Sequence, residues 1–368
     1  MNLQKFGRRD FLKRVGLAAP LFFSNPAAIA GGDIFHNHTG NFASKKMSVE
    51  TYLIKPERLR FGDVVGIAAP ASAPPDPGEV DHSFTALEKL GFKPKLAANV
   101  RQRLGFLAGT DEQRADDLMA LFADRGVKAI FCLRGGYGSA RLLQRLDFHF
   151  IKKHPKIFIG FSDITSLHCA MLSHAKMVSF HGPTLNTNLT SDAPEKFLTQ
   201  SLWRAVMEPA PAGGICEGYS PNTISILNKG VAKGQLVGGN LSVLCATLGT
   251  PFQPRFRNSI LFFEDVGEEP YRFDRMLTQL LNAGLLQQVA GVAVGVNLNC
   301  ESANSGKTKE YEQSLADVLA ERLMPLNVPV VTGLPFGHVA LNATLPVGIP
   351  ATLDGDNGDL IITETAVS

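Results

Sequence analysis

The stretch IFIGFSDITSLHCAML, residues Ile157 to Leu172, places an apolar run directly before a polar turn and a helix-like segment. The run 157–159 is typical of a buried strand, and the residues after Thr165 are typical of a helix. A strand that turns into a helix lifts the turn residue, Ser162, off the sheet, as a nucleophile elbow does. A simpler interpretation is that Ser162 or Asp163 caps the helix, since both residue types are preferred N-caps. The turn lacks the second glycine of G-x-S-x-G, so both interpretations stay open.

Around this stretch, apolar runs alternate with helix-like segments. We expect strands at 63–70, 95–100, 127–133, 157–161 and 177–180, and helices at 79–90, at 114–123 and from Ser139 onward. A capping box, Thr110 to Gln113, precedes the second helix. This alternation predicts a parallel sheet with helices on both faces, and ligands then gather at the carboxyl ends of its strands.

The second half of the chain is richer in strands and follows a Pro- and Gly-rich stretch at 207–219. We expect strands at 231–237, 260–264, 292–298, 328–334, 350–353 and 359–363, and helices at 241–248, 272–283 and 311–323. The fold class is therefore α/β, with an N-terminal parallel-sheet domain and a C-terminal β-rich mixed domain. The expected boundaries are 59–206 for the first domain, 207–232 for a linker region and 233–368 for the second domain.

Composition excludes several classes of protein. Lys and Arg number 36 and Asp and Glu 34, so no strong field attracts nucleic acid, and a small near-neutral substrate fits best. The five cysteines are odd in number and lack C-x-x-C spacing, which indicates neither a disulfide framework nor a zinc site. We interpret them as small core residues.

The N-terminus has the pattern of an export signal. A basic cluster with R-R-D-F-L-K at 8–13 precedes an apolar run at 15–23 and an A-x-A site at 28–30. The run is shorter than the ~20 residues that span a bilayer, so no stable membrane span is expected. The pattern resembles a twin-arginine signal at 1–30, with a linker at 31–58, and predicts a periplasmic protein. Alternatively, translation starts at Met47 and the protein is cytoplasmic.

A catalytic serine needs a base and an acidic partner, and several residues qualify. His168 and His174 fall on the helix after Ser162, where a structural role is the default. His181 follows an expected strand and His338 lies just beyond another, so each is a candidate base. Glu264 ends a very apolar strand and is either solvated or bonded to a functional group. Spacing does not show which of these are neighbours in space.

The segment R-G-G-Y-G, Arg134 to Gly138, follows another expected strand. Its glycines let the backbone approach a ligand, and a free amide there could hold an oxyanion. It could equally be a turn that only needs positive φ, or a phosphate loop, but the absence of both nucleotide-binding glycine patterns argues against a nucleotide. Arg134 is a candidate for binding a substrate carboxylate, or a surface ion pair, and Tyr137 is a further candidate for substrate binding.

Seven blocks carry a resemblance to a known family. They are R-G-G-Y-G-S-A-R-L-L from Arg134, G-F-S-D-I-T from Gly160, F-H-G-P from Phe180, G-Q-L-V-G-G-N-L from Gly234, F-F-E-D-V-G-E-E-P-Y-R-F-D-R-M-L from Phe262, V-T-G-L-P-F-G-H from Val331 and N-A-T-L-P-V-G from Asn342. In order and spacing they resemble the LD-carboxypeptidase family of serine peptidases, from about Leu59 to the C-terminus.

The resemblance implies a Ser-His-Glu triad: Ser162 as nucleophile, Glu264 as the orienting group and His338 as general base and acid. It also implies an oxyanion hole made by the amides of Asp163 and a glycine of the turn, Gly136. The family's usual substrate is a murein tetrapeptide or muropeptide, cut between meso-diaminopimelate and the terminal D-alanine. No metal or organic cofactor is implied, and known members look like homodimers.

Two rival functions stay open. A branch that resembles microcin C immunity proteins uses the same triad to cleave peptidyl- or aminoacyl-nucleotides. A protein that keeps the fold could also bind muropeptides without cleaving them, although the intact triad residues count against this.

Overall fold

The computed structural model describes residues 52–189, 195–219, 223–301 and 313–368. The expected export signal at 1–30 and most of the expected linker at 31–58 lie outside these residues. Among the described residues, no helix has both the length and the apolar character needed to cross a membrane.

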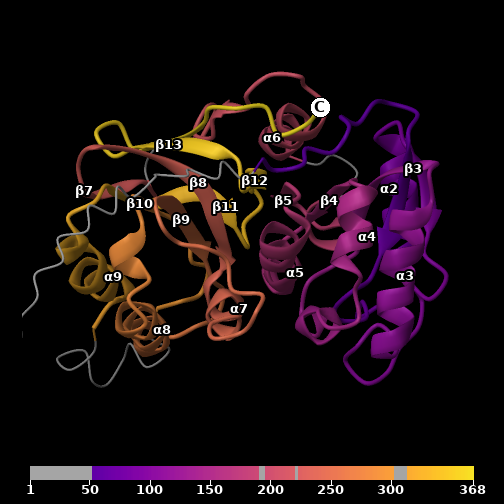
Figure 1. Cartoon of the computed structure of the whole chain (residues 1–368), viewed down its shortest axis with the longest axis horizontal. Helices are drawn as coiled ribbons and strands as arrows, with labels where there is room; N and C mark the ends of the chain where they lie inside the picture. The colour runs from indigo at the N-terminus through magenta and orange to yellow at the C-terminus, as the bar shows by residue number, and fades with distance from the viewer. Residues whose placement is uncertain (1–51, 190–194, 220–222, 302–312) are drawn as a thin grey trace, which may run out of the picture. The chain divides into compact units, whose positions relative to one another are not determined.

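The first sheet has six strands in the order β12-β5-β4-β3-β1-β2 (Figure 1). Its strands are β1 (Val64–Ala68), β2 (Lys93–Leu96), β3 (Val127–Cys132), β4 (Ile157–Gly160), β5 (Ser179–His181) and β12 (Leu345–Val347). β1 to β5 run parallel, as predicted. β12 comes from near the C-terminus and pairs antiparallel with β5, a contribution that the sequence did not indicate.

Helices accompany this sheet. They are α2 (Glu79–Lys89), α3 (Asp111–Ala123), α4 (Phe148–Lys153), α5 (Thr165–Ala170) and α6 (Lys196–Val206), with short 3-10 helices η1 (Ser139–Leu142) and η2 (Ser162–Ile164) and π-helical turns η3 (Met171–Ala175) and η4 (Leu185–Leu189). The predicted capping box is confirmed, because Gln113 N donates to Thr110 Oγ1 at 3.2 Å and Thr110 N donates to Gln113 Oε1 at 2.9 Å.

The second sheet has eight strands in the order β6-β14-β13-β8-β9-β10-β11-β7. They are β6 (Gly213–Gly214), β7 (Ser225–Asn228), β8 (Val231–Asn240), β9 (Ser259–Glu264), β10 (Gly291–Val296), β11 (Val330–Gly337), β13 (Pro350–Asp354) and β14 (Asp359–Ile362). β8 to β11 are parallel at the centre, and the outer strands are antiparallel. The β-rich mixed character predicted for this half is confirmed.

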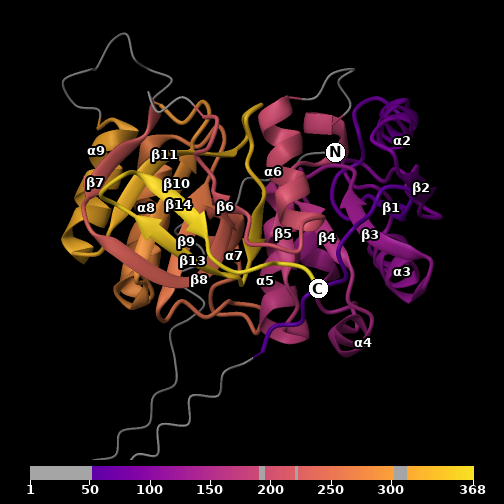
Figure 2. The same ribbon diagram turned by 90° about the horizontal axis from the view of Figure 1, so that it is seen from above.

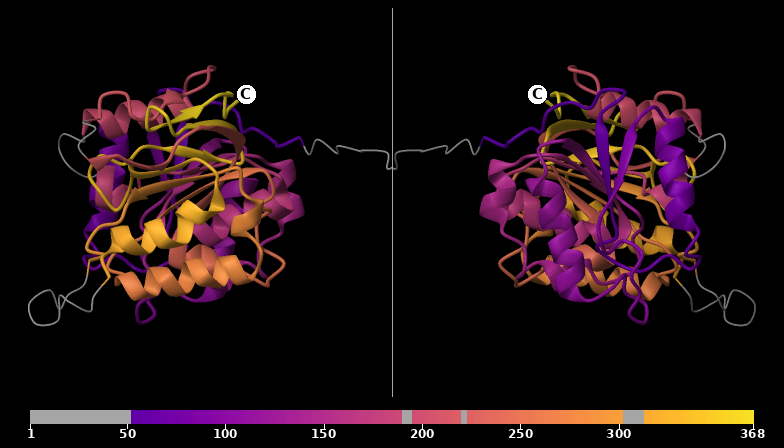
Figure 3. Two further views of the ribbon diagram at one scale, coloured as in Figure 1. Left: turned by 90° about the vertical axis from the view of Figure 1, so that its left-hand side faces the viewer. Right: turned by 90° about the vertical axis from the view of Figure 1, so that its right-hand side faces the viewer.

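Three helices cover one face of the second sheet: α7 (Leu241–Ala246), α8 (Pro270–Asn282) and α9 (Leu315–Leu323) (Figure 1). The left view of Figure 3 shows the orange α8 and α9 next to each other below the strands. The 3-10 turns η6 (Leu286–Gln288) and η7 (Met324–Leu326) also belong to this half. Side chains along β9 alternate between two cores, since Leu261 and Phe263 pack under these helices whereas Ile260 and Phe262 join the larger core.

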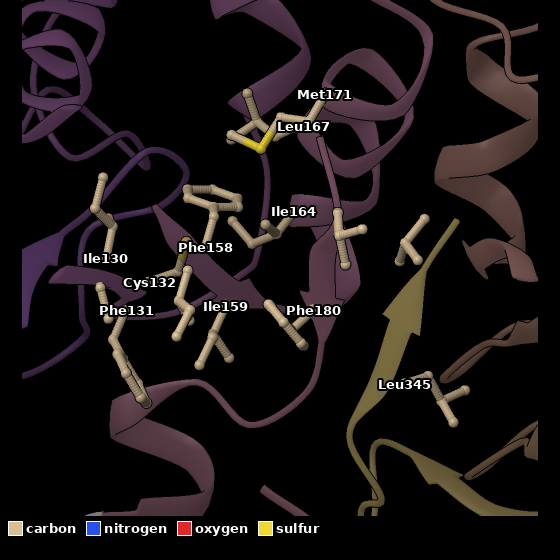
Figure 4. Packing of buried hydrophobic residues seen from close by; sticks show 14 of the residues in the cluster. Ile130, Phe131, Cys132, Phe158, Ile159, Ile164, Leu167, Met171, Phe180 and Leu345 are labelled. Carbon is tan, nitrogen blue, oxygen red and sulfur yellow. The ribbon is translucent and has the colours of Figure 1, made fainter. Parts of the chain in front are cut away.

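The larger core is continuous across both sheets. Phe131, Phe158 and Phe180 pack with neighbouring aliphatic side chains of the first sheet, and Leu345 of β12 belongs to the same cluster (Figure 4). The C-terminal segment returns to the beginning of the described chain (Figure 2), where Ser368 N donates to Pro56 O at 2.9 Å. The second half of the chain therefore helps to hold the first sheet in place.

The cysteines occupy the positions expected of small core residues. All five are free, and all are buried except Cys216, which is partly buried. Burial raises the pKa of the Cys169 and Cys245 thiols to about 12, so these groups stay protonated and unreactive at neutral pH.

Candidate active site

Ser162 sits at a sharp turn between strand β4 and the helical turn η2. Its φ is 63°, in the left-handed region that non-glycine residues rarely occupy. Neither Ser162 nor Asp163 caps a helix: Phe161 precedes η2, Ile164 precedes α5, and no side chain caps either helix. The N-cap interpretation was therefore wrong. A strained, partly exposed serine after a buried strand is the geometry of a nucleophile elbow.

The Asp163 carboxylate has another role, which is to tie this turn to the neighbouring R-G-G-Y-G segment. Its Oδ2 accepts a hydrogen bond from Ser139 N at 2.8 Å, and its carbonyl accepts one from Ser139 Oγ at 2.6 Å. Ser139 Oγ also lies 2.7 Å from Ser166 Oγ. These buried bonds fix the two turns relative to each other.

The glycines of R-G-G-Y-G allow this segment to approach Ser162 closely. A Cβ on Gly135 would lie 2.8 Å from Ser162 Cβ and 3.1 Å from its Oγ. Gly136 has φ 102°, and a Cβ there would lie 2.5 Å from Ser72 Oγ. The backbone of the segment therefore passes directly beside the candidate nucleophile.

Replacing Gly135 with Ala should test this close approach. The added methyl group has to displace either Ser162 or the backbone carbonyl of Phe161, which would be 3.2 Å away. We expect kcat to fall by about 10²-fold, because small misplacements of reacting groups have effects of that size. Steady-state kinetics, with circular dichroism to check the fold, would measure it. An unchanged kcat would show that the two turns can separate without consequence.

Two residues that the sequence analysis missed, Ser72 and Arg114, hold the R-G-G-Y-G segment in place through hydrogen bonds to its backbone. Ser72 Oγ accepts a hydrogen bond from Tyr137 N at 3.0 Å. Arg114 is almost fully buried and donates to Pro70 O at 2.5 Å and Gly138 O at 2.9 Å. Burial lowers the pKa of its guanidinium. The ion pair with Asp111 acts in the opposite direction and partly offsets this decrease. A buried arginine on a helix gives no local sequence signal, so only the structure shows this role.

Glu264 and His338 come together at the ends of β9 and β11. His338 Nδ1 lies 2.6 Å from Glu264 Oε2, and the glutamate side chain has no exposed surface. Gly337 makes this approach possible, because a Cβ there would lie 3.0 Å from Glu264 Oε2. The ring of His338 also packs against Phe161, with centroids 4.8 Å apart. The pair therefore lies beside the residue that precedes Ser162.

The environment of His338 sets its basicity. Burial lowers its pKa, but the hydrogen bond and negative charge of Glu264 act in the opposite direction and prevail, so the pKa is raised above its ordinary value. A carboxylate on Nδ1 also fixes the ring orientation and leaves Nε2 available for proton transfer.

The other candidate histidines have structural environments. His168 bonds Ser179 Oγ and Gly160 O, each at 2.8 Å, and burial lowers its pKa to about 4. His174 bonds Pro251 O at 2.9 Å. His181 is buried against the rings of Phe161, Phe262 and Phe336, and burial lowers its pKa well below the ordinary value. Of the four histidines, His338 alone is paired with a carboxylate.

Asn240 links the Glu264 carboxylate to the helix that follows Ser162. Its Nδ2 lies 2.8 Å from Asp265 Oδ1 and 3.5 Å from Glu264 Oε1, while its backbone N donates to Thr165 Oγ1 at 2.9 Å. Burial, and then the charge of Glu264, raise the pKa of Asp265. The sequence analysis missed Asn240 as well, although it belongs to the G-G-N of the block that begins at Gly234.

The remaining predicted residues, Arg134 and Tyr137, lie on the R-G-G-Y-G segment. Arg134 is partly buried, and its Nη1 donates to Ala73 O at 3.2 Å. The ring of Tyr137 is 54% exposed and packs against Phe106. A hollow of about 510 Å³ lies between η1, α5 and α7, with Ser166 and Ala246 in its lining. Across the described ranges, no group of three or more His, Cys, Asp or Glu residues could hold a metal ion.

Both halves of the chain match models of known protein domains. Residues 65–182 match the LD-carboxypeptidase N-terminal domain, and residues 233–353 match the LD-carboxypeptidase C-terminal domain. A probable murein peptide carboxypeptidase of Bacillus subtilis is 41% identical over 300 residues, which cover 82% of this chain and 91% of that protein. The chain belongs to the LD-carboxypeptidase family. This LD-carboxypeptidase is accordingly a serine-type carboxypeptidase.

Other relatives of this LD-carboxypeptidase carry more specific names. The murein tetrapeptide carboxypeptidase of Pseudomonas aeruginosa is 34% identical over 298 residues, covering 79% of this chain and 93% of that protein. The crystal structure of muramoyltetrapeptide carboxypeptidase from Oxalobacter formigenes matches with a TM-score of 0.68 at 31% identity, covering 82% of this chain and 99% of that one.

The LD-carboxypeptidase also has relatives of another function. The microcin C7 self-immunity protein MccF of Escherichia coli is 26% identical over 348 residues, covering 88% of this chain and 99% of that protein. An MccF-like protein from Bacillus anthracis has a TM-score of 0.73 at 24% identity, covering 84% of this chain and 99% of that one, and shows a shared fold. These comparisons do not test the predicted domain boundaries or the predicted roles of the triad residues, which stay predictions.

Proposed function

We propose that this carboxypeptidase removes the terminal D-alanine from murein tetrapeptides by cutting the bond between meso-diaminopimelate and D-alanine. The observation that carries the proposal is the buried Glu264 bonded to His338, whose ring packs beside the strained Ser162 turn. A serine, an imidazole and a carboxylate in this relation are the parts of a serine hydrolase triad. The names of the murein-specific relatives support the choice of substrate.

In the proposed reaction, Ser162 Oγ attacks the diaminopimelate carbonyl while His338 Nε2 takes its proton. The amides of Asp163 and Gly136 hold the oxyanion. Asp163 lies in the first turn of η2, where amides lack partners within the helix, and Gly136 follows Gly135 in the turn beside Ser162. His338 then gives its proton to the nitrogen of D-alanine, which leaves. Water attacks the acyl-serine, with His338 again as base, and releases the tripeptide. Glu264 stays ionised and stabilises the imidazolium.

The pH dependence of the reaction follows from the raised pKa of His338. Only the neutral imidazole accepts the serine proton, so kcat/KM should increase with pH as His338 loses its proton. Because the His338 pKa is raised, the midpoint of that increase should lie above the ordinary histidine value of about 6.5. A profile of kcat/KM from pH 5 to 9 measures it, and a midpoint below the ordinary value would contradict the Glu264 contact.

Arg134 is proposed to bind the free carboxylate of the substrate. It precedes Gly135, which lies beside Ser162, and its Nε is buried without a partner in the described part of the chain. A carboxylate could accept from such a guanidinium. We expect Arg134→Ala to raise KM for tetrapeptide about tenfold, as is typical of a lost charged hydrogen bond, with a smaller change in kcat. Unchanged kinetics would remove Arg134 from the site.

The function is tested by incubating the purified full chain with disaccharide-tetrapeptide and, in parallel, with an aminoacyl sulfamoyl adenosine. Both reactions contain a chelator, because no metal is part of the proposed chemistry. The proposal requires disaccharide-tripeptide and D-alanine from the first substrate. Cleavage of the adenosine compound alone would favour the immunity-type function that MccF's name describes. Binding of the muropeptide without cleavage would favour a non-catalytic binder.

Location and assembly are further parts of the proposal. The N-terminal basic and apolar pattern supports twin-arginine export to the periplasm, where the enzyme would trim stems on the wall or on its fragments. Cell fractionation with the native start codon should place the protein in the periplasm, and a purely cytosolic signal would favour a start at Met47. The family resemblance supports a homodimer, which sedimentation velocity would test.

A further inference from the structure

Two exposed aromatic rings form a platform at the edge of the candidate active site. Phe106 is 63% exposed and Tyr137 is 54% exposed, and their ring centroids lie 5.5 Å apart at an interplanar angle of 66°. Leu104, in the same loop as Phe106, is 55% exposed. Clusters of exposed large apolar side chains are uncommon on the surfaces of soluble proteins in general and often mark binding sites.

The backbone beneath this aromatic platform is firmly held. Leu104 and Leu107 bond each other in both directions, at 2.9 and 3.0 Å, so Phe106 lies in a tight turn. Phe106 O also accepts from Ala73 N at 3.1 Å, and Ser72 Oγ accepts from Tyr137 N. Rings on a fixed backbone lose little conformational freedom when a ligand binds.

The platform lies close to the nucleophile in space. Tyr137 is two residues after Gly135, whose added Cβ would lie 3.1 Å from Ser162 Oγ. Two residues span at most about 7 Å, and the Cα–Cβ bond adds about 1.5 Å, so Tyr137 Cα lies at most about 12 Å from Ser162 Oγ. A substrate held at Ser162 therefore has a neighbouring part within reach of these rings.

We propose that the platform of Phe106 and Tyr137 binds the amino-sugar ring to which the peptide stem is attached, so that the enzyme prefers glycan-linked tetrapeptide to free tetrapeptide. This inference rests on the proposed function. Aromatic faces carry partial negative charge and attract the C–H groups on the face of a pyranose ring. In a tetrapeptide stem, three residues separate the scissile bond from the sugar, a span of about 10 Å when extended. That span is of the same order as the upper bound of about 12 Å between the backbone of Tyr137 and Ser162 Oγ.

The test compares two substrates, disaccharide-tetrapeptide and free tetrapeptide, with the full-length wild type and Phe106→Ala. We expect the wild type to favour the disaccharide-linked substrate. Phe106→Ala should lose about five- to tenfold in kcat/KM on that substrate, since an aromatic contact contributes about 1 kcal/mol. Its kcat/KM on free tetrapeptide should stay within about twofold of the wild type. Equal losses on both substrates, or none on either, would overturn the proposal.

Two control variants show whether the substrate preference depends on the platform itself. Phe61 is 65% exposed and packs against Phe92 and Trp203, so Phe61→Ala removes an equally exposed ring elsewhere and should leave the substrate preference unchanged. Ala246→Phe fills the hollow beside α7, and a loss of preference in that variant alone would place the sugar there instead. A change from dimer to monomer in Phe106→Ala would show that a second copy covers the platform, and would also overturn the proposal.

A binding measurement distinguishes failure of this inference from failure of the proposed function. Calorimetric titration of disaccharide-tetrapeptide into Ser162→Ala, with and without Phe106→Ala, should show a five- to tenfold higher Kd in the double variant. An equal Kd in the two variants would overturn the platform even if the wild type releases D-alanine. Intact binding with the expected Kd difference, but no D-alanine release by the wild type, would leave the platform standing and reject the proposed reaction.

Discussion

Replacing Ser162 with Ala should lower kcat for D-alanine release by about 10⁵- to 10⁶-fold. The hydroxyl is the attacking group in the proposed reaction, and neither His338 nor the amides beside the turn can replace it. The substitution removes a single oxygen from a partly exposed position, so the Kd for disaccharide-tetrapeptide and the thermal unfolding midpoint should change little. Release of D-alanine, measured with an amino-acid oxidase assay, gives the rate.

The matched control is Ser173→Ala on the same helical segment. Ser173 Oγ bonds Cys169 O at 2.7 Å, at the end of the helix that is distant from the turn. We expect this variant to keep kcat within about twofold of the wild type, as is usual for substitutions away from special features. If Ser162→Ala also kept its rate within tenfold, Ser162 could not be the nucleophile.

Replacing Glu264 with Gln should lower kcat by about 10³- to 10⁴-fold. The shape of the side chain is kept, but the negative charge that stabilises the imidazolium is lost, and an amide can hold the wrong tautomer of His338. Glu264 also contributes to the raised pKa of His338, so the midpoint of the pH profile should move downward in this variant. The pH shift distinguishes this role from simple loss of packing.

Glu321→Gln is the control for a lost carboxylate. Glu321 lies on α9 and pairs with Arg322 at the surface, at 3.3 Å. An exposed ion pair contributes at most about 1 kcal/mol, so activity and pH midpoint should both stay as in the wild type. An unshifted midpoint in Glu264→Gln would show that the carboxylate does not control His338.

Much of the fold could be predicted because its strands are short, apolar and regularly spaced. β3 and β4 are buried along nearly their full lengths, and the expected ranges of 127–133 and 157–161 overlap them almost completely. Local patterns also indicated the capping box at Thr110. Such signals depend only on neighbouring residues, and a sequence displays these directly.

Other elements could not be predicted from the sequence, because their strand partners are distant along the chain or their residue patterns are mixed. β12 is three residues long, includes Pro346 and pairs with a strand more than 150 positions earlier. The second strand was expected to start after Pro94, yet Pro94 lies inside β2, where an edge strand tolerates it. α4 and α6 were not anticipated. The helix expected at 311–323 begins at Leu315, with Ser314 as its N-cap, and residues 302–312 lie outside the described part.

For the candidate site, the sequence indicated the residues but not their proximity. Glu264 ends β9, His338 directly follows β11, and the two are 74 positions apart, so only the parallel order β9-β10-β11 brings them together. Arg114 gave no local signal, because its role comes from contacts with other segments. Asn240 stood in the block that begins at Gly234, but its contacts with Asp265 and Thr165 show only in the structure. Motif resemblance could supply the roles of Ser162, Glu264 and His338, while spacing alone left His181 equally open.

The proposed chemistry is tested most directly by trapping its intermediate. The full-length wild type is mixed rapidly with disaccharide-tetrapeptide in the presence of a chelator, quenched with acid, and digested for mass measurement of the peptide that contains Ser162. We expect a burst of D-alanine and a fraction of that peptide carrying the disaccharide-tripeptide acyl group, with neither in Ser162→Ala. An acyl group on a different residue, or D-alanine release by Ser162→Ala at the wild-type rate, would contradict a reaction through Ser162.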